Sequence, residues 1–254
     1  MNLSKIFLSI SALTVLAFAG TEITQEQKTK LQMDYPELIG KPGITINKGI
    51  NHGKFTQVEL EVKTPKGVQQ FEVFVVDGIE TVFAGNAYDK TGKKIDLPKN
   101  GDLIKKGVAF TSGKGKEPIY LVTDPECPYC QKFEENIDPE VAKKYSINVI
   151  PMPLSFHKSA TPMFYWILSG KNNAEINKRF HAVMIEKNKE WEKFTPTEAE
   201  KAKLDEVIKN GLNAAMELKA GGTPSMFDKD FKQMDLGSLM KKAPTATPKQ
   251  VPQK

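Results

Sequence analysis

The chain has 254 residues, of which 39% are hydrophobic and 26% charged, with a net charge of +5. That length suffices for one or two domains with a hydrophobic core, and the composition excludes wholesale disorder. The lysines are spread along the chain, without the basic stripe of a nucleic-acid-binding protein. We therefore expect no nucleic acid among its partners.

Residues 1–19 have the pattern of a secretory signal peptide. Lys5 supplies the positive start, the run from Ile6 to Phe18 is almost wholly apolar, and Ala17-Phe18-Ala19 matches a cleavage site. The alternative is a membrane anchor, but a spanning helix needs ~20 apolar residues and this run is shorter. We predict cleavage after Ala19. A short signal with a compact positive start is typical of bacteria, so we expect a periplasmic protein.

Residues 20–95 predict a small β-rich domain. A short polar helix is expected over Thr24–Met33, followed by several strands. The segments Phe71–Val76 and Thr81–Phe83 flank Asp77-Gly78, which is a strong hairpin signal. Residues 96–116 then predict a linker. A short helix is expected there over Asp102–Phe110, although Gly107 weakens that interpretation.

Residues 117–242 contain the two cysteines of the chain, Cys127 and Cys130. Ile119–Thr123 reads as a buried strand that ends at the turn signal before Cys127. Pro128 suits the first turn of a helix. Cys127 is therefore expected at the start of a helix, where unpaired backbone N–H groups and the helix dipole favour a thiolate.

Three interpretations of this cysteine pair were compared. A disulfide across two residues closes a very small loop, so it would add little stability as a structural bridge. A closed zinc site needs four ligands, but there is no second C-x-x-C and the histidines His52, His157 and His181 are scattered. Redox exchange fits best: the Cys127 thiolate attacks a disulfide, and Cys130, one helical turn further on, releases the partner. No metal and no cofactor are expected.

The rest of the chain predicts a second buried strand and then mainly helices. The strand is Ile147–Ile150, helices are expected over Ser159–Lys219, and strands return over Pro224–Phe231. A final helix is expected over Leu236–Lys242 and a disordered tail over residues 243–254, which contain three prolines among small and polar residues. His157 and His181 are interpreted as surface residues or as residues that support the site, rather than as catalysts.

Two segments resemble the DsbC/DsbG family of periplasmic disulfide isomerases. Val122-Thr123-Asp124-Pro125-Glu126-Cys127-Pro128-Tyr129-Cys130 is similar to the active-site segment of that family, and Gly221-Gly222-Thr223-Pro224-Ser225-Met226-Phe227 is similar to its cis-proline loop. The resemblance implies an α+β fold. In that fold a thioredoxin-like catalytic domain with a helical insertion (residues 117–242) follows an N-terminal dimerisation domain (20–95) and a linker (96–116).

The resemblance also implies roles for six residues. Cys127 and Cys130 would form the redox-active disulfide, and Pro128 and Tyr129 would tune the thiolate. Thr223 and a cis Pro224 would line the substrate groove. Relative to the family, this chain lacks a further structural disulfide, carries Gln131 where some relatives have His, and has the Pro-Tyr dipeptide of the DsbG side.

The predicted function is isomerisation or reduction of incorrect disulfides in exported proteins. The expected partners are exported proteins with cysteines, a second copy of the chain in a homodimer, and a membrane redox partner that reduces or oxidises the cysteine pair. The alternatives are a dimeric oxidase that introduces disulfides, a holdase-type chaperone, and a thiol donor for one dedicated client. The reduction potential decides between the isomerase or reductase and the oxidase, and the sequence does not fix it.

Overall fold

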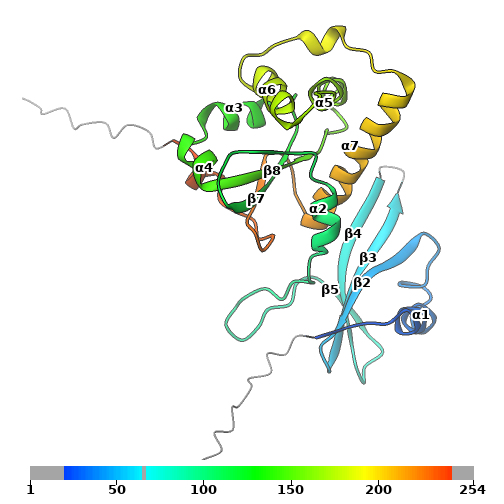
Figure 1. The fold of residues 1–254 in the computed structure, drawn as a ribbon. Coiled ribbons are helices and arrows are strands. Elements are labelled where there is room, and N and C mark those ends of the chain that lie inside the picture. Colours follow the sequence, from blue (N-terminus) through cyan, green and yellow to red (C-terminus); the bar gives the residue numbers. More distant parts are fainter. Residues whose placement is uncertain (1–19, 65–66, 242–254) are drawn as a thin grey trace, which may run out of the picture. The chain divides into compact units, whose positions relative to one another are not determined.

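The computed structural model describes residues 20–64 and 67–241. The predicted signal peptide (1–19) and tail (243–254) lie outside the described residues. The chain divides between Pro98 and Lys99 into two compact units, each described by itself below (Figure 1). None of the helices in the described ranges combines the length and the apolar character that a membrane span requires.

The first unit is an antiparallel sheet with one helix packed on it (Figure 1). The sheet order is β1-β2-β3-β4-β5, with the strands β1 (Thr21–Glu22), β2 (Ile44–Asn51), β3 (Phe55–Thr64), β4 (Gly67–Val76) and β5 (Val82–Ala84). The helix α1 (Gln25–Asp34) starts at Thr24, which forms a capping box with Gln27. The predicted helix is confirmed, and so is the predicted hairpin, because β4 pairs with β5 in the register Val75↔Val82.

A small apolar core lies on one face of this sheet. It is formed by Ile39, Val58, Leu60, Val73 and Val75. Val58 pairs directly with Val73, so alternate residues of β3 and β4 point to the same face.

The second unit is a four-stranded mixed sheet with helices on both faces. Its elements are α2 (Gly101–Lys106), β6 (Phe110–Ser112), β7 (Glu117–Thr123), α3 (Pro128–Asn136), α4 (Pro139–Lys144), β8 (Tyr145–Pro151), α5 (Ala160–Leu168), α6 (Asn173–Met184), α7 (Glu198–Leu218) and β9 (Ser225–Phe227), with 3-10 turns η1 (Glu190–Lys193) and η2 (Leu236–Leu239). The strand order is β6-β8-β7-β9, in which β7 and β8 are parallel and β6 and β9 antiparallel to their neighbours.

Alternation along β7 divides the core of this unit between the two faces of the sheet. Ile119 and Leu121 join the larger cluster, which includes residues of α3, α5 and α6. Tyr120 and Val122 point the other way and pack with residues of α2 and α7. The helices α5, α6 and α7 lie between β8 and β9, so the α+β class, with a helical insertion in a thioredoxin-like domain, is confirmed.

The region 96–116, predicted as a linker, contains α2 and β6 of the second unit. α2 ends at Lys106, with Gly107 as its C-cap, four residues before the predicted end at Phe110, which starts β6 instead. A side chain at position 107 would meet Ala214 of α7 within 2.2 Å, so the glycine that weakens the sequence prediction permits close helix packing. Ile104 is fully buried in that contact.

The end of the second unit is also less regular than predicted. Only β9 forms a strand, and Phe231 lies in a turn with φ +60°, where the Asp228 side chain accepts from the backbone N–H groups of Asp230 and Lys232. In place of the predicted final helix there is the short η2, which starts at Asp235. Asn and Asp side chains compete with regular structure in this way.

Candidate active site

Cys127 lies where β7 ends and α3 begins. It is the N-cap residue of α3, with Pro128 in the first turn, and its backbone N–H donates to Asp124 O at 3.2 Å. No side chain caps this helix end. The sulfur is therefore held at a helix N-terminus, beside backbone N–H groups that have no partner within the helix.

The second predicted segment meets Cys127 because β9 pairs with β7. Val122 and Ser225 are partners in this pairing, which brings Thr223 and Pro224 beside the active-site turn. The Thr223–Pro224 peptide bond is cis. The Cys127 thiol lies 3.5 Å from Thr223 O and donates to it. The structure thus brings Cys127, Thr223 and Pro224 together from positions almost a hundred residues apart.

Cys130 is buried in the first turn of α3, beneath Cys127. Both cysteines are free thiols and both are buried. Burial raises the pKa of the Cys130 thiol to about 12, against the opposing effects of the Thr223 and Thr123 hydroxyls and the Asp124 backbone. Cys130 is therefore a neutral thiol at ordinary pH, which suits a residue that acts only after Cys127.

Two threonine hydroxyls near Cys130 have no ordinary hydrogen bond. Thr123 Oγ1 and Thr223 Oγ1 are buried and unpartnered within the described ranges. An unpartnered buried hydroxyl is costly, so such atoms call for an explanation. Both hydroxyls lie close enough to the Cys130 sulfur to lower its pKa. They are donors that a thiolate at Cys130 would satisfy.

The remaining predicted site residues differ in exposure. Pro128 starts α3, and Tyr129 leaves 75% of its surface exposed between the two cysteines. Tyr129 thus faces solvent rather than the sulfur atoms' buried surroundings. Gln131, the next residue after Cys130, donates from Nε2 to Pro125 O at 2.8 Å and accepts from Lys187 Nζ at 3.0 Å.

Asp124 and His157 also lie at the site. No role was predicted for Asp124, whereas His157 was predicted to be a surface or supporting residue rather than a catalyst. Asp124 is fully buried, and its Oδ2 lies 2.8 Å from His157 Nδ1. An acidic residue directly after a buried strand and before Cys127 was an available signal. His157 lies 33 residues away, and nothing local to it indicates the contact.

Glu134, like Cys130, is a residue of α3 whose pKa is raised. It keeps part of its surface exposed, but protein atoms surround its carboxyl group, and burial raises its pKa to about 7. Glu134 follows Cys130 by four residues, so both lie on the same side of the helix. No hydrogen bond or ion pair of its side chain is found within the described ranges.

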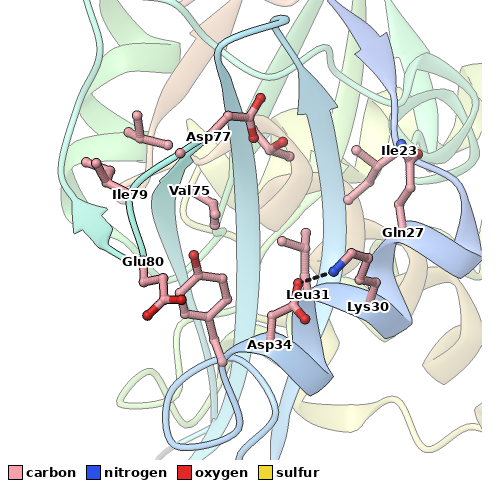
Figure 2. Close-up of a pocket in the computed structure, with 13 residues that line it drawn as sticks. Ile23, Gln27, Lys30, Leu31, Asp34, Val75, Asp77, Ile79 and Glu80 are labelled. Atoms are coloured by element: carbon pink, nitrogen blue, oxygen red, sulfur yellow. Dashed lines mark hydrogen bonds and ion pairs between the residues drawn. The ribbon is translucent and has the colours of Figure 1, made fainter.

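The first unit contains a pocket of about 450 Å³ between α1 and the end of β4 (Figure 2). Its apolar wall includes Ile23, Leu31 and Val75, and its polar rim includes Asp77 and the ion pair Lys30–Asp34, with 2.7 Å between Nζ and Oδ2. The residues lining it include no cysteine and no histidine. This pocket therefore offers no side chain for the thiol chemistry predicted at Cys127.

Comparison with known proteins agrees with the fold of the second unit. Residues 105–233 match the family described as thioredoxin-like domain. No curated protein matches the chain. Among solved structures, the catalytic domain of Proteus mirabilis ScsC is 20% identical over 54% of this chain and 89% of its own, with a TM-score of 0.36.

Two further solved structures are similar to this chain. The thiol-disulfide exchange protein alpha-DsbA2 from Wolbachia pipientis is 15% identical over 54% of this chain and 92% of its own, with a TM-score of 0.40. DsbG of Helicobacter pylori is 11% identical over 80% of this chain and 100% of its own, with a TM-score of 0.38.

Proposed function

The chain belongs to the thioredoxin-like domain family, and we propose from the arrangement of its two cysteines that it is a thiol–disulfide oxidoreductase acting on exported proteins. The observation that carries the proposal is the position of Cys127 at the N-terminus of α3, against the backbone of Thr223 and above the buried Cys130. A sulfur in this position has the surroundings of a nucleophile, whereas Cys130 has those of a resolving thiol.

Exchange begins when the Cys127 thiolate attacks one sulfur of a substrate disulfide. A Cys127–substrate bond forms, the substrate S–S bond breaks, and the other substrate sulfur leaves as a thiolate. In isomerisation, that thiolate or another one in the substrate re-forms a disulfide and releases Cys127, with no net electron transfer. In reduction, Cys130 loses its proton and attacks the Cys127 sulfur, so that the Cys127–substrate bond breaks and the second substrate sulfur leaves as a thiolate. The protein is oxidised to its disulfide, and the substrate gains two electrons.

We assign the net direction to isomerisation or reduction. The raised pKa of the buried Cys130 thiol supports isomerisation, because a protonated thiol is slow to release the substrate from Cys127 and so leaves time for disulfides within the substrate to rearrange. Net reduction consumes electrons, so it requires a redox partner that reduces the Cys127–Cys130 disulfide, and we propose a membrane protein for that step. Export to the periplasm rests on the signal pattern of residues 1–19.

The first unit is proposed to form a homodimer. It is a compact unit of its own, and it exposes Phe71 and Phe83 on β4 and β5. Sedimentation of the mature full chain tests this: a dimer is expected, and a monomer at micromolar concentration would exclude it.

Trapping of the mixed disulfide tests the assignment of the two cysteines. With Cys130→Ala, a covalent complex between Cys127 and substrate should accumulate, because nothing within the protein resolves it. Cys127→Ala should trap nothing, since the raised pKa of the Cys130 thiol keeps it protonated at ordinary pH. Accumulation with Cys127→Ala alone would reverse the two roles, and accumulation with neither variant would rule out disulfide exchange.

Two refolding assays test the direction. The reduced protein is given scrambled, fully oxidised ribonuclease, and the oxidised protein is given reduced ribonuclease. Recovery of ribonuclease activity in the first assay is expected. Recovery in the second assay alone would replace the isomerase with the alternative oxidase function.

A further inference from the structure

The loop between β8 and α5, residues 152–159, is bonded at four points to the segment immediately before Cys127. The backbone N–H of Met152 donates to Thr123 O at 2.9 Å, and that of Leu154 donates to Asp124 Oδ2 at 2.7 Å. Further along, His157 Nδ1 contacts Asp124 Oδ2, and the Ser159 N–H donates to Glu126 Oε2 at 2.6 Å. The loop and the active-site turn are therefore held together as one structural element.

Asp124 is the centre of this element. Its Oδ1 accepts from the Glu126 N–H at 2.8 Å, while its Oδ2 faces both Leu154 and His157. A fully buried carboxylate is tolerated only when donors surround it, and a carboxylate can only accept, so the His157 ring donates from Nδ1. Asp124 thereby fixes the loop and the turn that carries Cys127 in one arrangement.

Phe156 lies within this fixed loop and points to solvent. It leaves 72% of its surface exposed, and its ring stands edge-on to His157 with 4.5 Å between the ring centres. Because most of the ring stays in contact with water, it contributes little hydrophobic stabilisation to the folded protein. The anchors on either side of it, Leu154 and Ser159, are bonded to residues one to three positions before Cys127.

We propose that Phe156 binds an apolar side chain next to the target cysteine of the substrate polypeptide, and that Asp124 and His157 are positioning residues that hold Phe156 there. This inference rests on the proposed function and adds a substrate preference to it. The substrate class is an unfolded or misfolded polypeptide, because such chains expose apolar residues beside their cysteines. Phe156 would contact the substrate without taking part in the exchange of sulfur bonds.

Two reduced peptides that differ only in the residue after their cysteine, Phe or Ser, test the preference. Each is reacted with the oxidised full-length protein, and dithiothreitol serves as a thiol without peptide contacts. Phe156→Ser should slow the reaction of the Phe peptide about fivefold, because apolar and aromatic contacts are lost. The reaction rates of the Ser peptide and of dithiothreitol should stay unchanged. Met216→Ser, which removes another exposed apolar side chain, is the matched control and should change none of the rates.

The outcomes separate this inference from the proposed function. If Phe156→Ser slows both peptides equally, or slows neither, the role of Phe156 is overturned, although the wild-type protein still reacts with the peptides. A wild-type protein whose disulfide reacts with neither peptide nor dithiothreitol would overturn the proposed function itself.

Two substitutions of His157 test the positioning role. His157→Phe keeps a ring against Phe156 but removes the donor to Asp124, whereas His157→Asn keeps an N–H donor. The Phe variant should show the same selective loss on the Phe peptide as Phe156→Ser, and the Asn variant should restore the wild-type ratio of the two peptide rates. Equal ratios in both His157 variants would mean that the hydrogen bond to Asp124 does not position Phe156.

Discussion

Both units bury polar side chains with hydrogen-bond partners, but among the described residues only the second unit also buries side-chain hydroxyls without them. In the first unit Gln57 is fully buried, and its side chain contacts His52 Nε2 at 3.2 Å, Ile95 O at 3.1 Å and Glu72 Oε2 at 3.4 Å. Glu59, also buried there, accepts from Asn47 Nδ2 at 2.8 Å. These groups have exchanged water for protein partners, so their burial is compatible with a stable fold.

In the second unit the buried Thr123 and Thr223 hydroxyls lack ordinary partners within the described ranges, and both lie near Cys130. We infer that buried polar groups with hydrogen-bond partners support the structure. Buried hydroxyls without such partners mark the place where a charge forms during the reaction. Fixed donors of this kind stabilise such a charge without reorganisation. Four predictions test the contrast.

The largest effect is expected in the pH dependence of Cys130. Because its thiol has a pKa of about 12, only the small thiolate fraction reacts, and this fraction rises with pH. In Cys127→Ser, alkylation of Cys130 by iodoacetamide should therefore rise roughly a hundredfold between pH 7 and pH 9 without levelling off. The same variant unfolded in denaturant should level off near the ordinary cysteine pKa of about 8.5. A plateau below pH 9 in the folded protein would show that burial does not suppress ionisation.

The next effect concerns a satisfied group of the first unit. Gln57→Leu should leave the Ile95 carbonyl and His52 without their partner and destabilise the unit by about 2 kcal/mol. Hydrogen exchange of β3 and β4 in the full chain measures this loss. Gln69→Leu, at an exposed position of β4, is the control and should change stability by less than about 0.5 kcal/mol. Disulfide exchange should stay at the wild-type rate in both variants.

A third prediction concerns Glu134, whose pKa is raised by burial from 4.5 to about 7. Between these values the folded protein binds more protons than the unfolded chain, so stability falls as pH rises through this window. The full shift corresponds to ~3 kcal/mol, and we expect about 2 kcal/mol because part of the side chain stays exposed.

Urea unfolding at pH 5 and pH 8, followed by the fluorescence of Trp166 and Trp191, measures the Glu134 effect. Both tryptophans belong to the second unit. Glu134→Gln should remove the fall in stability between these two pH values. A fall of the same size in the variant would assign it to another group.

The smallest effect on stability is expected for Thr123→Val. The substitution keeps the shape and removes a hydroxyl that has no ordinary partner, so the stability should change by less than about 1 kcal/mol. Since this hydroxyl lowers the pKa of Cys130, its loss should raise that pKa further and slow the release of the mixed disulfide. Thr123→Ser keeps the donor and serves as the control. A release rate in Thr123→Val equal to that of wild type would exclude the hydroxyl from the reaction.

The sequence predicted the local elements of the site because local rules determine them. The continuous apolar run of Ile119–Thr123 before a turn signal indicated a buried strand, and Pro128 indicated the start of a helix, so Cys127 was expected at their junction. The helix of the first unit and the Asp77-Gly78 hairpin were likewise predictable from capping and turn residues. The approach of Thr223 and Pro224 was expected through a family resemblance rather than from their own neighbours in the chain.

Only the tertiary structure decided which distant polar groups meet. His157 reaches Asp124 because the parallel pairing of β7 and β8 brings the loops after the two strands to the same edge of the sheet. Gly107 ends α2 where that helix approaches α7, and the sequence showed the glycine but not the helix opposite it. The shift in the pKa of Cys130 likewise depends on burial and on two hydroxyls, one from β7 and one from the segment before β9. Such contacts depend on how strands pair and helices pack, which short-range sequence patterns do not encode.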